Sequence, residues 1–242
     1  MPELVKAKMP MPQKIAHLTT RLLPIKLSGT IMRLLAGLGN PGSNYAMNRH
    51  NVGFLAVDRI ADRHGCSPWK KKGASLISDG RIGSEKIVLV KPQSFMNKSG
   101  LPIVEIARFH KIDTNDIFVF HDELDLAVGK LRVKTGGGHG GHNGLRDIDR
   151  HIGVDYWRVR IGIGRPPNEA VDVKSWVLAD FGRDEQTGWL PTLLDAMADE
   201  ADRLVEHDDG GFMSRVSYLA PAPQPKGDDG KDKPAGAISK QN

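Results

Sequence analysis

The chain has 242 residues, of which 39% are hydrophobic, so it is long enough for one domain of ordinary size or two small ones. No apolar run approaches the roughly 18 residues of a membrane span, and the N-terminus lacks the unbroken apolar stretch of a secretory signal, which favours a soluble, cytoplasmic protein with no membrane partner. The net charge of +5 is no evidence for nucleic-acid binding by itself, because residues 32–220 carry 25 basic and 25 acidic residues, so any anion site must be a local patch.

The two ends of the chain differ in composition from its middle. Residues 1–31 carry four prolines and precede a strand-like run that starts at Met32, another possible start of the protein. We expect an N-terminal extension that is disordered or added by an upstream start; an organellar transit peptide is the alternative, weakened by the single arginine. Residues 221–242 hold one large aliphatic residue and are expected to form a disordered tail. The domain is therefore expected to span residues 32–220.

Between these ends, strand-like and helical patterns alternate. Apolar runs typical of strands lie at 31–38, 86–90, 117–120, 130–134 and 156–163. Helical spacing of apolar residues lies at 52–65, 103–109, 145–152 and 190–205. The alternation predicts an α/β fold, a single domain with a central mixed, partly parallel twisted sheet flanked by helices. The one cysteine, Cys66, agrees with a reducing compartment and, lying in no catalytic-looking motif, is expected to be inert.

Three polar segments each follow a predicted strand. They are Gly39-Asn40-Pro41-Gly42, with Tyr45 and Arg49-His50-Asn51 behind it; Phe95-Met96-Asn97-Lys98-Ser99-Gly100; and His121-Asp122-Glu123-Leu124-Asp125. Open α/β sheets place their sites beyond the carboxyl ends of their strands. If these strands are neighbours, the three segments converge on one cleft, together with the glycine-rich strip described below.

His50 is the candidate general base, because histidine is the side chain whose ordinary pKa suits base chemistry near neutral pH. A carboxylate that accepts the other ring N–H fixes the tautomer and strengthens the base, and Asp122 is the candidate for that role. No serine or cysteine lies in a GxSxG or comparable setting. We therefore expect His50 to activate water directly.

Three asparagines are expected to bind substrate. An amide side chain offers a donor and an acceptor but cannot transfer protons at neutral pH. Asn40, Asn97 and Asn143 therefore suit a substrate with ester or peptide groups, whose developing oxyanion needs fixed donors worth roughly 10²- to 10³-fold each.

The strip Thr135–Ile148, TGGGHGGHNGLRDI, combines a run of glycines with two histidines and an asparagine. Glycines are costly to order, so they indicate backbone at positive φ or a ligand pressed close to the main chain. We expect Asn143 to cap the helix that follows. A phosphate-binding loop is one alternative, weakened because the chain contains no GxxxxGK[ST] and the strip does not match GxGxxG. A simple surface loop is the other.

Four stretches together resemble bacterial-type peptidyl-tRNA hydrolase: GLGNPGSNYAMNRHNVGF, FMNKSG, HDELDLAVGKLRVKTGGGHGGHNGLRDI and YWRVRIGIGRP. They occur in the family's order and with similar spacing, from about Met32 to about Leu219. The resemblance implies a monomeric α/β esterase that cuts peptidyl-tRNA between the peptide and the terminal ribose and so releases free tRNA for reuse in translation. It also implies no metal and no organic cofactor.

The resemblance implies a role for each matching residue. His50 becomes the general base, Asp122 the carboxylate that orients it, and Asn97 the donor to the oxyanion. The expected substrate-binding residues are Asn40, Tyr45, Met96, Gly140, His142 and Asn143. Lys134 and Arg160 match the basic pair that grips the tRNA 5′ phosphate and would supply the local patch; otherwise they are ordinary strand-edge charges.

Two other classes stay open. An RNA-binding protein without hydrolytic activity could use Lys134, Arg160 and the glycine-rich strip, but it would gain nothing from a base paired with a carboxylate. A metal-dependent hydrolase could draw ligands from His50, His121, Asp122, His139 and His142. HExxH, facial-triad spacing and cysteine ligands are absent, and chelation separates this class from a metal-free enzyme.

Overall fold

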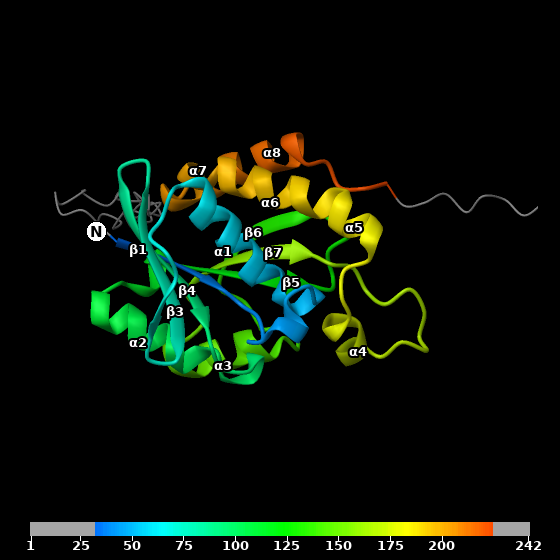
Figure 1. The fold of residues 1–242 in the computed structure, drawn as a ribbon, viewed down its shortest axis with the longest axis horizontal. Helices are drawn as coiled ribbons and strands as arrows, with labels where there is room; N and C mark the ends of the chain where they lie inside the picture. Colours follow the sequence, from blue (N-terminus) through cyan, green and yellow to red (C-terminus); the bar gives the residue numbers. More distant parts are fainter. Residues whose placement is uncertain (1–31, 225–242) are drawn as a thin grey trace, which may run out of the picture.

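The computed structural model describes residues 32–224, and the domain they form is a seven-stranded sheet between two layers of helices (Figure 1). The expectations for residues 1–31 and for 225–242 of the tail lie outside the described residues. The strands are β1 (Met32–Gly37), β2 (Lys70–Lys72), β3 (Ser75–Ile82), β4 (Glu85–Pro92), β5 (Ile117–Glu123), β6 (Leu131–Thr135) and β7 (Trp157–Gly162).

The sheet is mixed, as the sequence predicts. Its strand order is β2-β3-β4-β1-β5-β7-β6. The four central strands β4, β1, β5 and β7 are parallel to one another, while β2, β3 and β6 pair antiparallel at the two sides. Because the central strands share one direction, their carboxyl ends meet at the same edge.

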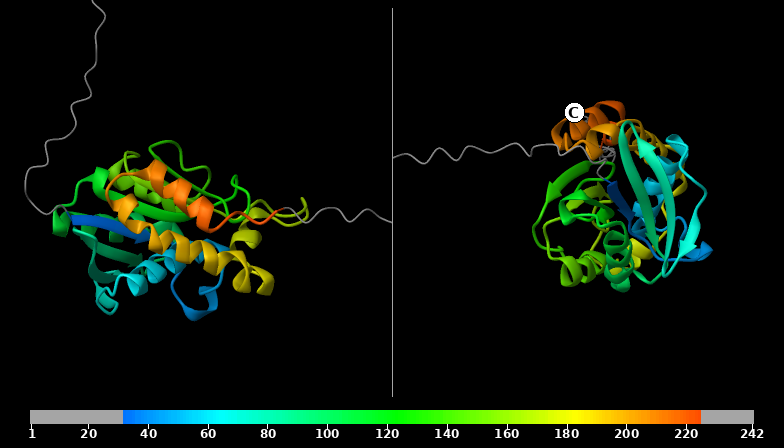
Figure 2. Two further views of the ribbon diagram at one scale, coloured as in Figure 1. Left: turned by 90° about the horizontal axis from the view of Figure 1, so that it is seen from above. Right: turned by 90° about the vertical axis from the view of Figure 1, so that its left-hand side faces the viewer.

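Helices cover both faces of the sheet. The α-helices are α1 (Val52–Arg63), α2 (Gly100–His110), α3 (Asn143–Ile152), α4 (Val173–Leu178), α5 (Arg183–Thr187), α6 (Trp189–Asp199), α7 (Ala201–Val205) and α8 (Asp209–Leu219). The helices α1, α6, α7 and α8 pack on one face, and α2 and α3 pack on the other. Figure 2 shows α8 lying beside α6. Within the described residues, every helix is too short or too polar to cross a bilayer.

The sequence analysis did not predict the strands β2 and β3 or the α-helices α4, α5 and α8, and apart from the 11-residue α8 these elements are short or polar. The edge strand β2 and its neighbour β3 carry few apolar residues, with Asp79, Gly80 and Arg81 inside β3. The helices α4 and α5 have 6 and 5 residues, too few for a 3.6-residue period to be recognised. The helix expected at 190–205 is broken at Glu200 into α6 and α7.

The start of α1 is held tightly against the sheet. Gly53 lies so close that a Cβ there would come within 2.2 Å of the Phe120 carbonyl oxygen. The Phe54 N–H donates to the Leu38 carbonyl oxygen at 3.2 Å. The residues just before α1, His50 among them, are therefore fixed beside the carboxyl ends of β1 and β5.

Candidate active site

A cleft of about 640 Å³ opens at the carboxyl ends of the parallel strands. The loops after β1 and β4, the end of β5 and the glycine-rich strip all contribute to its lining, as do α3 and α4. The four segments expected to converge therefore do so, with one correction: β5 continues through Glu123, so Asp122 lies within the strand rather than after it.

His50 and Asp122 form a buried hydrogen-bonded pair in this cleft. His50 lies in a 3₁₀ turn, Arg49–Asn51, that leads into α1. Its Nδ1 is 2.8 Å from Asp122 Oδ1, and the two side chains are 11% and 3% exposed. The pair joins segments 72 residues apart in the sequence.

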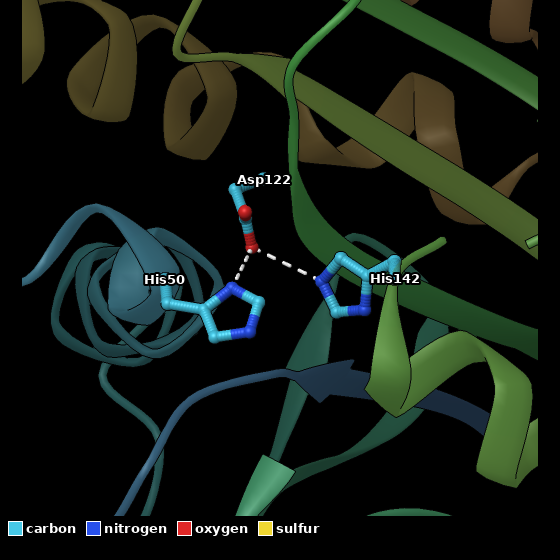
Figure 3. Close-up of side chains that lie close together, drawn as sticks. All are labelled: His50, Asp122 and His142. Atoms are coloured by element: carbon cyan, nitrogen blue, oxygen red, sulfur yellow. Dashed lines mark hydrogen bonds and ion pairs between the residues drawn. The ribbon is translucent and has the colours of Figure 1, made fainter. Parts of the chain in front are cut away.

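His142 completes the arrangement from the opposite side, as Figure 3 shows. Its Nε2 lies 3.0 Å from the same Asp122 Oδ1. Its Nδ1 accepts from the backbone N–H groups of Gly144 and Leu145, at 3.1 and 3.3 Å. His142, not Asn143 as expected, is thus the N-cap of α3, because its ring reaches the free amides of the first turn while also contacting Asp122.

These contacts assign the ring protons. Two N–H groups point at His142 Nδ1, so that nitrogen is unprotonated and Nε2–H donates to Asp122. Because a carboxylate only accepts, His50 must donate to it from Nδ1–H. His50 Nε2 is then left without a proton, which is the form that a general base requires.

Burial and charge act against each other on both partners. Burial lowers the pKa of His50, but the charge of Asp122 and its hydrogen bond outweigh burial, so the pKa is raised. Burial raises the pKa of the Asp122 carboxyl, but the two imidazoles hold it well below its usual range. Asp122 therefore stays ionised, and His50 is a stronger base than an ordinary histidine.

His121, next in the chain to Asp122, is a different kind of histidine. It is fully buried, and burial together with nearby His142 lowers its pKa to about 3. Its Nδ1–H donates to the Asp122 carbonyl oxygen at 2.8 Å. We conclude that His121 is neutral and structural rather than a base.

Asn40 connects the loops after β1 and β4. Its Oδ1 accepts from the Met96 N–H at 2.8 Å. Its backbone N–H and carbonyl oxygen pair with the side chain of Asn51, both at 2.9 Å. The Asn40 amide N–H₂ has no partner among the described residues, so it is the group that can face a ligand.

A family model described as peptidyl-tRNA hydrolase matches residues 34–224, nearly the whole described domain. The chain belongs to the peptidyl-tRNA hydrolase family. The match contains all four motifs on which the resemblance was based, so that expectation is confirmed.

Relatives support this membership along most of their length. Peptidyl-tRNA hydrolase of Chelativorans sp. (strain BNC1) is 56% identical over 186 residues, covering 77% of each chain. That of Dinoroseobacter shibae is 52% identical over 207 residues, covering 85% of this chain and 87% of the relative. A crystal structure of peptidyl-tRNA hydrolase from Acinetobacter baumannii is 38% identical, with a TM-score of 0.73, and covers 80% of this chain and 98% of that one.

Most of the residues expected in the site of this peptidyl-tRNA hydrolase family member line the cleft. They are Asn40, His50, Met96, Asn97, Asp122, Gly140, His142 and Asn143. Met96 is buried, whereas Asn97 and Asn143 are exposed. The Asn143 Oδ1 accepts from Arg146 Nη1 at 3.1 Å.

Tyr45, Lys134 and Arg160 do not line the cleft. Tyr45 is half-buried in a 3₁₀ turn after β1. The Lys134 ammonium lies against the glycine-rich strip, where a Cβ on Gly137 would come within 2.9 Å of it. Arg160 Nε donates to Glu123 Oε2 at 3.0 Å, and Glu123 does line the cleft. The two cations therefore lie on the adjacent strands β6 and β7.

The glycine-rich strip needs its glycines for backbone conformation. Gly136, Gly137, Gly140 and Gly141 have φ between 55° and 90°, a region that other residues rarely adopt. Gly140 and Gly141 would have open space around a Cβ. The turn itself, rather than close packing, therefore requires glycine there.

The metal alternative has partial geometric support. Within residues 32–224, His50, Asp122 and His142 are the one group whose ligand atoms lie within 4.8 Å of one another. The other two candidates, His121 and His139, do not join them. In the hydrogen-bonded arrangement, Asp122 Oδ1 accepts from both rings, so a metal would have to replace both hydrogen bonds.

Two buried arginines that support the cleft were missed at the sequence level. Arg49 donates to the Asp180 carbonyl oxygen at 2.6 Å and to Glu185 at 2.7 Å, next to α4. Arg158 donates to the Gly138 carbonyl oxygen at 2.7 Å and to Asp149 at 3.0 Å, which anchors the glycine-rich strip. Charged residues are mostly exposed, so the sequence predicts an exposed side chain at both positions. The one hint in the sequence is that Arg49 directly precedes His50, the candidate base.

Proposed function

We propose that His50 and Asp122 hydrolyse the ester bond of peptidyl-tRNA by activating water without a metal. Family membership establishes the coarse activity, hydrolysis of peptidyl-tRNA, over 77–87% of the relatives' length. The observation that carries the mechanism is the 2.8 Å hydrogen bond from His50 Nδ1 to Asp122, which leaves Nε2 unprotonated on a residue that lines the cleft.

In the first step, water adds to the ester carbonyl carbon while His50 Nε2 takes one of its protons. The carbonyl oxygen becomes an oxyanion, and the amide of Asn97, an exposed residue of the turn Met96–Lys98, donates to it. The intermediate then collapses, the bond to the ribose oxygen breaks, and His50 returns the proton to that oxygen. The products are a free peptide carboxyl group and the ribose hydroxyl of tRNA.

Asp122 does not take the proton in this scheme. It stabilises the imidazolium that forms on His50 and holds the ring in one tautomer. His142 supports it by donating a second hydrogen bond to the same oxygen. A fixed carboxylate makes the base effective because no side chain has to reorient during the step.

The remaining residues bind the substrate. Asn40, Met96 and Asn143 contact the peptide beside the ester, and Gly140 and the ring face of His142 contribute the opposite wall. Tyr45 lies where the tRNA end enters. Lys134 and Arg160 grip the 5′ phosphate, which suits their place beside the cleft rather than in it. A small number of local phosphate contacts predicts a modest salt dependence.

We further propose that residues 32–220 form the complete catalytic unit and that the protein acts as a monomer in the cytoplasm, returning tRNA to translation. The cleft-lining residues of the described domain all lie within residues 32–220, which supports the first part.

The test is release of free tRNA from N-acetyl-aminoacyl-tRNA in EDTA by wild type and by His50→Ala. We expect wild-type turnover and a loss of roughly 10²- to 10⁴-fold in the variant. His151→Ala is the control, because His151 is exposed on α3 outside the cleft lining. Binding of tRNA without turnover would favour the RNA-binding alternative, and turnover restored by added metal would favour the metalloenzyme.

A further inference from the structure

The acidic residues that line the cleft are all engaged by other groups. Asp122 accepts from His50 and His142. The Glu123 carboxylate accepts from Arg160, and Asp147 Oδ2 accepts from the Gly100 N–H at 2.7 Å. Each negative charge is therefore directed toward a partner in the protein.

The basic residues that line the cleft are not neutralised in this way. Arg146, Arg150 and Lys174 are exposed and take part in no salt bridge within the described residues. Arg146 donates only to the neutral amide of Asn143. The side chain of Arg150 has no partner in the part of the chain that the structure describes. Lys174 shares its surroundings with the exposed Asp172 carboxylate, whose pKa is lowered by hydrogen bonds from Ser175 and also by the Lys174 charge. Arg146 and Arg150 have no carboxylate partner among the described residues, so the cleft presents two unpaired positive charges and a third that is exposed beside an acid.

These charges occupy two separate elements. Arg146 and Arg150 lie one turn apart on α3, so their side chains share one face of that helix. Lys174 lies on α4, another part of the cleft lining. A polyanionic strand that enters the cleft meets a cation from each of these two helices.

We propose that Arg146, Arg150 and Lys174 bind the backbone phosphates of the single-stranded 3′ end of the tRNA. This inference rests on the proposed function, because the ester that His50 attacks is carried on the last ribose of that end. The nucleotides next to the ester must lie within the cleft when the ester reaches His50. Their phosphates are the substrate groups of opposite charge nearest to the reaction.

This subsite is distinct from the pair Lys134 and Arg160. That pair lies outside the cleft lining, and Arg160 is already paired with Glu123. The cleft cations act on the strand that carries the ester, whereas the outer pair acts on the 5′ phosphate.

The experiment compares three substrates that carry the same N-acetyl-aminoacyl ester: adenosine, the trinucleotide CCA, and whole tRNA. Adenosine has no phosphodiester, so it reports the chemistry alone. The variants are Arg150→Gln and the double variant Arg146→Gln with Arg150→Gln. Arg150→Gln gives the cleanest result because the Arg150 side chain has no bonding partner in the described domain. Arg183→Gln is the matched control, since Arg183 is exposed on α5 outside the cleft lining.

We expect kcat/KM of the double variant on CCA and on tRNA to fall about tenfold relative to its value on adenosine, mainly through KM. The slope of log kcat/KM against log salt should decrease by roughly 0.7 for each phosphate that the variant no longer binds. Arg183→Gln should show neither change.

Three outcomes would overturn the subsite. An equal loss on all three substrates would show that the arginines act on the chemistry or the shape of the cleft. A loss on tRNA but not on CCA would place their contacts outside the 3′ end. No loss on tRNA would make them a solvated surface. If wild type hydrolyses none of the substrates, the proposed function fails instead, and the subsite fails with it.

Discussion

The floor and the rim of the cleft differ in burial and in how many of their polar groups have partners in the protein. On the floor, the side chains of His50, Asp122 and His142 are at most 11% exposed, and both histidines hydrogen-bond to Asp122. On the rim, Asn97, Asn143 and Arg150 are exposed, with few partners in the described domain. The floor groups already have partners in the protein, whereas the rim groups are available to the substrate in the proposed function.

This difference separates activity from stability. A buried polar group that loses its partner costs free energy of unfolding, because it was removed from water when the chain folded. An exposed side chain is hydrated by water when its partner is removed, so its substitution leaves the free energy of unfolding almost unchanged. Such a substitution changes only ligand binding or turnover. Substitutions on the floor should therefore affect folding and catalysis together, and those on the rim catalysis alone.

The largest effect is expected for Asp122→Asn on the floor. The amide oxygen could still accept from both rings, but the amide carries no charge to stabilise the His50 imidazolium, and its N–H₂ can instead donate to Nδ1 and favour the wrong tautomer. We expect kcat to fall roughly 10²- to 10⁴-fold, measured as tRNA release under saturating substrate. Asp125→Asn, at an exposed residue paired with Arg165, is the control, and a loss of less than about tenfold in Asp122→Asn would contradict the assigned role.

The next effect is on stability, at the buried support of the glycine-rich strip. The Arg158 side chain is 1% exposed and pairs with Asp149, which also accepts from the Tyr156 hydroxyl at 2.8 Å. Arg158→Met leaves that carboxylate without its charge partner and should cost about 3–5 kcal/mol in the free energy of unfolding. Denaturant titration measures it.

The comparison for that prediction is Arg63→Met, because Arg63 forms ion pairs with Asp195 and Asp199, and these three side chains are 40%, 39% and 42% exposed. It should change stability by no more than about 1 kcal/mol. Equal losses in the two variants would remove the distinction between buried and exposed charges.

On the rim, Asn97→Ala should lower kcat by roughly 10²-fold, since one donor to the oxyanion is removed. The unfolding transition should stay where it is, because Asn97 is exposed. Steady-state kinetics checks the expected fall in kcat, and thermal unfolding of the same preparation checks that stability is unchanged. A rise in KM with kcat unchanged would assign Asn97 to substrate binding instead.

The smallest expected effect is a shift in the pH at which kcat/KM falls on the acid side. His50 acts as a base only when unprotonated, and its pKa is raised by Asp122. The acid limb of kcat/KM should therefore lie above the ordinary histidine value of about 6.5, with activity lost as pH falls through that limb. In Asp122→Asn the limb should move to lower pH. A limb at the same pH in both proteins would show that another group controls it.

The sequence was sufficient for the central part of the fold and for the pairing of His50 with Asp122. Apolar patterns in the sequence predict the burial of the strands β1, β4, β5 and β7 and of the helices α1 and α2. His50 and Asp122 were predictable because each follows or ends such a strand, and parallel strands end at one edge.

Only the tertiary structure determines which polar groups are hydrogen-bonded to each other. The N-cap of α3 is His142 rather than Asn143. The His142 ring is hydrogen-bonded to Asp122, and this contact holds the ring at the start of the helix. Arg49 and Arg158 are buried because carbonyl oxygens and carboxylates from other segments surround them. A sequence pattern records the local preference of each residue for water or the core, but the partner of a polar group is set by the packing of distant segments, which no local pattern contains.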